Sequence, residues 1–254
     1  MSIVEAIIIG LVQGLTEFLP ISSSGHLVIL QNLLKIYSPG NLIEVSAHLG
    51  TLLSIIFIYK KDIYDLIASL KSPNTKNYIL LVILASIPSV AFVLIAKPFI
   101  LMLFDSTRSV SLALIFTGII LFFSSFGNYT VNKISTSKGL IIGLFQALAI
   151  LPGISRSGMT ISIALLLGIR NREAAKFSFM LAIPAIFGAT ILTILDTEFS
   201  QSQDLILPLI ITAFVAFVSG YFALSFLIKI LNNGKFYYFS IYCIFIGIIS
   251  LLYL

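Results

Sequence analysis

Six long apolar windows constrain the fold of this chain more than any other feature of its sequence. Each holds roughly 17–24 residues, enough at about 1.5 Å per residue to cross the roughly 30 Å hydrocarbon core of a membrane as an α-helix. With 59% hydrophobic and only 10% charged residues, the chain lies outside the range of soluble domains. We therefore predict an all-α integral membrane protein with six spanning helices. The windows are residues 42–59, 79–96, 110–126, 177–195, 205–228 and 236–254.

Two further apolar segments are broken at a proline, and the two breaks resemble each other. Residues 10–26 contain GLVQ, then Leu-Pro, then SSSGH. Residues 143–159 contain GLFQ, then Leu-Pro, then SRSGM. A break in a helix inside a membrane leaves backbone N–H groups unpaired, and only protein, water or a ligand can satisfy them. Paired broken helices therefore predict a buried binding site.

The lysine-rich loop at residues 60–77 indicates the orientation of the chain, because loops rich in Lys and Arg stay in the cytoplasm. Three predicted spanning helices, an odd number, separate the two breaks, so the second copy enters the membrane from the opposite side. We predict a single transmembrane domain, residues 1–254, of two inverted repeats at about residues 1–129 and 130–254. Each repeat is a re-entrant helix-loop-helix plus three transmembrane helices, and the two loops meet within the membrane. Complete crossing by residues 3–19 stays open as an alternative.

Charge and cysteine content argue against several other classes of protein. The net charge is +5, but the basic residues lie between apolar windows without forming a continuous basic face, so we expect no nucleic-acid partner. The single cysteine, Cys243, cannot form a disulfide within the chain and has no metal-ligand spacing. The first residues lack a basic region and a cleavage pattern, so no removable signal peptide is expected.

The first broken segment carries a carboxylate at membrane depth. Gln13 and Glu17 stand one helical turn apart and share a helix face. A charged group inside the bilayer is expensive, so a partnered functional group is the default interpretation of Glu17. The structural alternatives are that Glu17 caps a loop or only pairs with Arg156. Gly10 and Gly14, spaced as small-xxx-small, favour a close contact between helices.

Serines and glycines surround both breaks. A helix that begins after such serines attracts anions at its N-terminus, and the guanidinium in the second break suits phosphate oxygens. The glycines allow the backbone to approach a ligand closely. Helix capping alone is the alternative explanation of the serines, and a structural pair with Glu17 is the alternative for the arginine. The candidate anion-binding residues are Ser22, Ser23 and Ser24 in the first break and Gly153, Ser155, Arg156, Ser157 and Gly158 in the second.

His26 occupies the position that Met159 holds in the second copy, so the two breaks differ in their chemistry. Histidine can act as general base, general acid or phosphoryl acceptor because its reference pKa is about 6.5. A hydrogen-bonded core histidine is the alternative. His48 and Glu44, four residues apart, are further candidates for lining the cavity, with structural polar packing as their alternative.

These motifs resemble those of the undecaprenyl-diphosphatases, the bacitracin-resistance proteins of bacterial membranes, and the resemblance covers nearly the whole chain. One signature is Glu or Gln, three residues, then Glu, which residues 13–17 match, and the other is PGxSRSG, which residues 152–158 match. SSSGH at residues 22–26 and GLTEFLP at residues 14–20 add specificity. The resemblance implies hydrolysis of undecaprenyl diphosphate to undecaprenyl phosphate and inorganic phosphate at the plasma membrane, which recycles the carrier lipid for cell-wall synthesis.

The resemblance also implies a divalent cation, Mg²⁺ or Ca²⁺, and an active site that faces the outer side of the membrane. Gln13 departs from family members that carry Glu there and cannot be an anionic ligand, which argues against a two-carboxylate metal site. A water nucleophile stays open. The implied roles are metal binding or base catalysis for Glu17, nucleophilic attack for His26 or Ser23, and phosphate binding for Arg156, Ser155 and Ser157.

The substrate of such an enzyme has a polar head and a long isoprenoid tail, which predicts a lateral opening between helices. The competing hypothesis is a secondary anion transporter or a polyprenyl-phosphate flippase. Inverted repeats with broken helices recur in transporters, and a fold alone does not decide function. Assembly into a homodimer is also compatible with the sequence.

Overall fold

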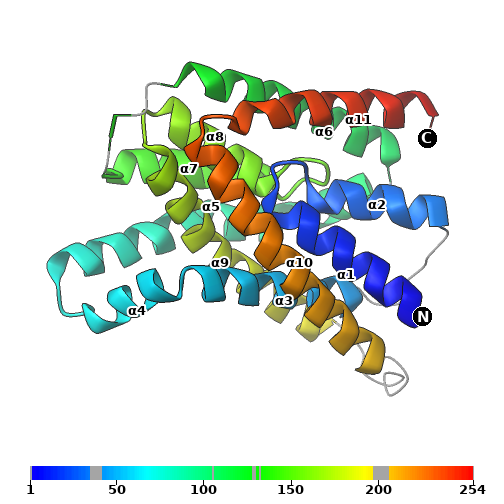
Figure 1. The fold of residues 1–254 in the computed structure, drawn as a ribbon, viewed down its shortest axis with the longest axis horizontal. Helices are drawn as coiled ribbons and strands as arrows, with labels where there is room; N and C mark the ends of the chain where they lie inside the picture. The colour runs from blue at the N-terminus through cyan, green and yellow to red at the C-terminus, as the bar shows by residue number, and fades with distance from the viewer. Residues whose placement is uncertain are drawn as a thin grey trace.

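The computed structural model describes residues 2–34, 42–104, 106–127, 130–131, 133–196 and 206–253, and these ranges are almost entirely helical (Figure 1). Within them, the β-pairing is limited to an isolated parallel bridge between Val131 and Ile169. The predicted boundary between the repeats, at residue 129, lies outside the described residues. The elements are α1 (Ile3–Phe18), α2 (Ser23–Leu34), α3 (Leu42–Ile58), α4 (Lys60–Ala68), α5 (Pro73–Phe104), α6 (Thr107–Phe123), η2 (Ser124–Phe126), α7 (Thr136–Leu148), α8 (Arg156–Leu166), α9 (Asn171–Asp196), α10 (Ile206–Asn232), η4 (Phe236–Tyr238) and α11 (Phe239–Tyr253).

The spanning helices correspond to the apolar windows of the sequence. In the described ranges, five segments are long and apolar enough to cross a membrane: α5, α6 together with η2, α9, α10, and η4 together with α11. α3 and α4 form a bent pair, with 70° between them, that passes as a sixth span. The prediction of an all-α membrane protein is therefore confirmed, and the predicted number of six spans is reached when the bent pair counts as one span.

The prediction of a loop at residues 60–77 is wrong, because α4 forms within it. The sequence KKDIYDLIA is amphipathic: Ile63 and Leu66 pack against the core, whereas Ile67 is exposed. Asp62 also forms an ion pair with Lys176 of α9 at 2.5 Å. These contacts give a short, charged segment enough partners to become a helix.

α1 and α2 form the first broken segment. Ser2 caps α1, since its hydroxyl accepts a hydrogen bond from the Glu5 amide while the Glu5 side chain accepts one from the Ser2 amide. The helix ends at Leu19, whose backbone is extended, as expected for a residue that precedes proline. With 16 residues, or about 24 Å, α1 is shorter than the helices that can cross a membrane, which favours re-entry over complete crossing.

α7 and α8 form the second broken segment. α7 begins at Thr136, and the Ser135 hydroxyl caps it by accepting a hydrogen bond from the Lys138 amide of its first turn. Ser155 caps α8 by accepting from the Gly158 amide. α8 has 11 residues, and residues 157–165 are all buried. The polar N-terminus of this short helix therefore lies inside the molecule.

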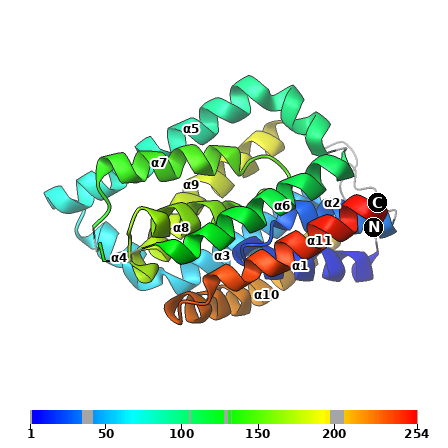
Figure 2. The same cartoon turned by 90° about the horizontal axis from the view of Figure 1, so that it is seen from above.

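The two halves of the chain exchange packing partners (Figures 1 and 2). α1 packs along α10, and its counterpart α7 packs along α5. In the same way α3 packs on α10 and α9 packs on α5, while α6 pairs with α11. Two inverted copies would produce this reciprocity. It supports the inverted repeat, whose boundaries stay a prediction.

Two glycines allow the close contact between α1 and α10. A Cβ at Gly10 would lie 2.7 Å from the Thr212 carbonyl oxygen, and one at Gly14 would lie 1.9 Å from Ser219 Oγ. The small-xxx-small pattern therefore serves tight packing between the two halves of the chain.

The core lies around α8 and α9, next to both breaks. At the end of α1, the Phe18 ring packs edge-on against Phe179 of α9, with 5.7 Å between the ring centroids. Thr160 of α8 and Ser178 of α9 share a buried hydrogen bond of 2.6 Å. Because α9 contacts the end of α1 and the first turns of α8, it positions the two breaks opposite each other.

Candidate active site

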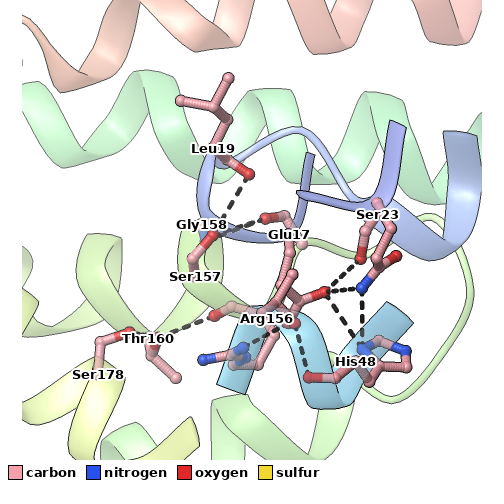
Figure 3. A network of polar contacts seen from close by, with 12 residues as sticks. Glu17, Leu19, Ser23, His48, Arg156, Ser157, Gly158, Thr160 and Ser178 are labelled. Atoms are coloured by element: carbon pink, nitrogen blue, oxygen red, sulfur yellow. Dashed lines mark hydrogen bonds and ion pairs between the residues drawn. The ribbon is translucent and has the colours of Figure 1, made fainter. Parts of the chain in front are cut away.

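An ion pair joins the two broken segments. Arg156, the first residue of α8, donates from Nη2 to Oε1 of Glu17 in the last turn of α1 at 2.6 Å (Figure 3). The two side chains are 14% and 7% exposed, so the pair is largely buried. The breaks therefore meet inside the protein, as the sequence led us to expect.

The second carboxylate oxygen of Glu17, Oε2, accepts further hydrogen bonds (Figure 3). Ser23 Oγ donates to it at 2.7 Å and Gln13 Nε2 at 2.9 Å. His48 Nδ1 lies 3.7 Å from the same oxygen and 2.9 Å from Gln13 Nε2. A carboxylate with a hydroxyl on one side and a guanidinium on the other can take a proton from the first while the second neutralises charge.

The backbone of the first break is strained at Ser22, whose φ of +66° lies in the left-handed region. Residues other than glycine rarely adopt this region. Ser22 Oγ accepts a hydrogen bond from the Gly25 amide at 3.2 Å and lies 3.3 Å from Ser24 Oγ. The turn brings Ser23, the first residue of α2, beside Glu17.

Thr117 of α6 holds the second break. Its hydroxyl donates to the Gly153 carbonyl and accepts from the Ser155 amide, both at 3.1 Å. Gly153 has a φ of +92°, and a Cβ there would lie 2.3 Å from the Val110 carbonyl oxygen. The turn and the contact with α6 thus explain Gly153 without a ligand. Neither Gly153 nor Gly158 lines the cavity described below, contrary to their expected role in ligand approach.

The two serines that flank Arg156 have different surroundings. Ser155 lines the cavity in addition to capping α8. Ser157 Oγ donates to the Leu19 carbonyl at 3.4 Å and lies 3.3 Å from Ser155 Oγ. Ser157 therefore links α8 to the end of α1, and the structure does not place it on the cavity wall.

A cavity of about 280 Å³ lies between the two breaks. One part of its wall is polar, and the other part is apolar and comes from α5, α9 and the α7–α8 connection. Such a site suits a ligand with a charged head and an apolar tail. The polar lining residues are Glu17, Ser22, Ser23, Ser24, His48, Ser155 and Arg156, and the apolar ones are Ile100, Ala149, Ile150, Ile154, Ala185, Ile186 and Ala189.

The structure does not bring His26 into this group. Its Nδ1 lies 2.8 Å from the Ser22 carbonyl oxygen and its Nε2 lies 2.8 Å from the Tyr242 hydroxyl, with the two rings stacked. His26 does not line the cavity, and both ring nitrogens have protein partners. The geometry thus favours the hydrogen-bonded alternative over a catalytic role. His48 faces Glu17 instead, and Glu44 does not line the cavity.

Two buried polar atoms of the site have no hydrogen-bond partner among the described residues: Arg156 Nη1 and Gln13 Oε1. A buried donor or acceptor without a hydrogen-bond partner lowers the stability of the fold, so each such atom calls for an explanation. Arg156 Nη1 belongs to a side chain that lines the cavity. A phosphate oxygen bound there would satisfy it.

The donor set does not fit a cation held by the protein alone. Across the described ranges, no three His, Cys, Asp or Glu side chains cluster closely enough to hold a metal ion. Glu17 already receives Arg156, Gln13 and Ser23, and the guanidinium repels a second cation. The amide at position 13 offers no second carboxylate.

The spans, the paired breaks and the buried carboxylate, serine and arginine define a multi-pass membrane protein with a partly polar cavity, a candidate anion site, between two broken helices. The family model described as bacitracin resistance protein BacA matches residues 6–249, and the chain belongs to this family. An undecaprenyl-diphosphatase of Carboxydothermus hydrogenoformans is 41% identical over 96% of this chain and 94% of its own length. That of Protochlamydia amoebophila is 41% identical over 100% of this chain and 99% of its own. The undecaprenyl-diphosphatase of Halothermothrix orenii is 38% identical over 99% of this chain and 98% of its own length.

Proposed function

We propose that this protein hydrolyses undecaprenyl diphosphate to undecaprenyl phosphate and inorganic phosphate, and so recycles the carrier lipid of the cell wall. The three relatives are named undecaprenyl-diphosphatases, and this chain matches each of them over nearly its full length. The observation that carries the proposal is the arrangement of Ser23, Glu17 and Arg156, whose hydroxyl, carboxylate and guanidinium meet at one cavity.

In the proposed mechanism, Ser23 is the nucleophile. Its Oγ attacks the terminal phosphorus, and Glu17 Oε2, 2.7 Å away, takes the hydroxyl proton. The bond between this phosphorus and the bridging oxygen breaks, and undecaprenyl phosphate leaves with the proton that Glu17 passes to it. Water then attacks the phosphoserine, and one of its protons passes through Glu17 to Ser23 Oγ. This step releases inorganic phosphate and restores the hydroxyl.

Arg156 and the N-terminus of α8 neutralise the charge of the transferred group. Phosphoryl transfer depends mainly on positioning and on neutralising the equatorial oxygens. Arg156 lines the cavity, and its Nη1 is buried without a hydrogen-bond partner among the described residues. A shift of the guanidinium toward the substrate would let Nη1 bind one of these oxygens while Nη2 stays on Glu17. The Ser155 hydroxyl lines the same cavity and adds a second donor.

Acid quench during turnover, followed by mass spectrometry, tests the nucleophile. We expect a phosphate adduct on Ser23 in the native protein and none in Ser23→Ala, with turnover reduced at least about a thousandfold. Ser24→Ala is the matched control, because Ser24 lines the cavity without contacting Glu17, and it should keep the adduct. Substantial turnover by Ser23→Ala would transfer the role to water oriented by Glu17.

Phosphate release from the purified protein in detergent separates hydrolysis from transport. A flippase or an anion transporter needs a sealed bilayer to act, whereas hydrolysis does not. Release of one phosphate per diphosphate in micelles supports the enzyme, and its absence favours the transporter.

We further propose that the cavity opens to the outer side of the bacterial plasma membrane. The orientation rests on the cytoplasmic assignment of the lysine-rich segment at residues 60–77 and on the family resemblance. A membrane-impermeant thiol reagent applied to intact cells should modify Ser24→Cys in a Cys243→Ala background. Protection in intact cells, with labelling only after lysis, would reverse the orientation. Assembly into a homodimer is a separate hypothesis, which the mass of the protein–detergent complex tests.

We propose that the divalent cation, Mg²⁺ or Ca²⁺, enters as a complex with the diphosphate, since the described residues offer no cluster of metal ligands for it. The chelator EDTA should then reduce phosphate release, and added Mg²⁺ should restore it. Without substrate, titration calorimetry should detect no Mg²⁺ binding by the protein. Tight binding that Glu17→Gln abolishes would instead support a metal site at Glu17.

A further inference from the structure

His48 lies outside both sequence signatures, yet it lines the cavity from α3. Its Nδ1 is 2.9 Å from Gln13 Nε2 and 3.7 Å from Glu17 Oε2. The second distance is too long for a hydrogen bond. Gln13 is therefore the hydrogen-bond partner of His48 Nδ1, and Glu17 is a charged neighbour.

The chemistry of Glu17 decides how the Gln13 amide is oriented. Glu17 is ionised, because the Arg156 guanidinium lies 2.6 Å from Oε1, and an ionised carboxylate only accepts hydrogen bonds. The Gln13 group that lies 2.9 Å from Oε2 must then be the NH₂. The reverse orientation would place two acceptor oxygens against each other.

The amide orientation in turn decides the state of His48. The same NH₂ group lies 2.9 Å from His48 Nδ1 and can only donate, so Nδ1 must accept and carries no proton. A neutral imidazole with an unprotonated Nδ1 carries its proton on Nε2. Nε2 lies on the opposite edge of the ring from Gln13, and no hydrogen bond joins it to any of the described residues.

We propose that His48 is a substrate-binding residue, whose Nε2–H donates a hydrogen bond to a phosphate oxygen of the diphosphate, and that Gln13 holds the ring in this tautomer. The side chain is 35% exposed, so it is open to the cavity. The inference rests on the proposed function of that cavity. In this proposal Gln13 keeps the proton of His48 on Nε2. A carboxylate at position 13 would have the opposite effect, because it would accept a hydrogen bond and favour the proton on Nδ1.

Nitrogen NMR of the imidazole side chains tests the tautomer without any activity measurement. The chain contains two histidines, so the full-length protein labelled with ¹⁵N-histidine gives two sets of ring signals. Comparison with His48→Gln assigns the His48 set, and His26 is the internal reference. We expect His48 to be protonated at Nε2 in the native protein and at Nδ1 in Gln13→Glu, with the His26 signals unchanged.

Added inorganic phosphate tests the contact itself, and it should shift the Nε2 signal of His48 in the native protein. For turnover, we expect His48→Ala to raise KM about tenfold or more, as for loss of a hydrogen bond to a charged group, with a much smaller change in kcat. His48→Gln keeps an N–H donor and should recover part of this loss. Melting temperatures of His48→Ala and His48→Gln equal to that of the native protein would exclude a folding defect.

Two results would overturn the inference: an Nδ1-protonated His48 in the native protein, or an unchanged KM in His48→Ala. Failure of the proposed function has a different signature. In that case the native protein releases no phosphate from the diphosphate, whatever the tautomer of His48.

Discussion

Replacement of Arg156 by Ala, alone and together with Glu17→Gln, tests whether the ion pair between Arg156 and Glu17 has only a structural role or also a catalytic one. The pair with Glu17 has a distance of 2.6 Å, and both side chains are largely buried. Removing one partner of a buried pair leaves an uncompensated charge, which costs about 3–5 kcal/mol. Glu17 keeps its bonds from Gln13 and Ser23, so we expect Arg156→Ala to lower the free energy of unfolding by about 3 kcal/mol, the lower end of this range.

The double variant Glu17→Gln/Arg156→Ala should recover most of this stability, because no buried charge remains without a partner. Its activity should not recover. If Arg156 stabilises the transferred phosphoryl group, its loss lowers kcat/KM by roughly a hundredfold to a thousandfold, and the loss of Glu17 adds to this. The assay is phosphate release from a short polyprenyl diphosphate in detergent, with thermal unfolding followed in the same detergent.

Arg156→Lys is the matched control for charge. Lysine keeps a positive charge near Glu17 but lacks the second nitrogen that Arg156 offers to the cavity. We expect near-native stability and at least about a tenfold loss of kcat/KM, as for the loss of one charged hydrogen bond. Native kcat/KM in Arg156→Lys, or recovered turnover in the double variant, would refute the catalytic role.

Three further predictions concern packing, surface charge and the cation. Gly14→Ala should cost about 1–3 kcal/mol, because the new Cβ would lie 1.9 Å from Ser219 Oγ. Gly188→Ala, with nothing within 4 Å of its Cβ, should leave the melting temperature unchanged or raise it slightly. Asp62→Asn breaks a partly exposed pair with Lys176, so it should cost at most about 1 kcal/mol and less at high salt, measured by thermal unfolding. EDTA should suppress phosphate release, and the midpoint of Mg²⁺ restoration should rise with the diphosphate concentration.

The helices and the meeting of the two breaks could be predicted because local chemistry controls them. The apolar windows match the spans, and Pro20 and Pro152 mark the breaks. Glu17 and Arg156 are charged residues that lie next to the breaks of the two apolar segments, which made their contact a reasonable expectation. Membrane burial leaves a charge with few partners other than an opposite charge, and this rule needs no knowledge of the fold.

The choice between the two histidines could not be predicted. His26 belongs to a motif and His48 does not, yet His48 faces Glu17 and His26 contacts Tyr242. Tyr242 is 216 positions away from His26 along the chain, so no local pattern connects them. The role of Gly153 could not be predicted either, because its close contact with Val110 depends on how α6 packs. Side-chain direction at a break is set by these tertiary contacts, which the spacing of residues does not encode.

The exchange of packing partners has a consequence for how this protein is made. α1 leaves the ribosome early, but the helix that covers its glycine face, α10, begins only at Ile206. At typical synthesis rates α1 waits roughly 10–40 s for that partner. During this interval the nascent chain depends on the insertion machinery and surrounding lipid to shield its unmatched surface. Premature termination before residue 206 would therefore leave α1 without its partner, so late nonsense mutations should behave as complete losses.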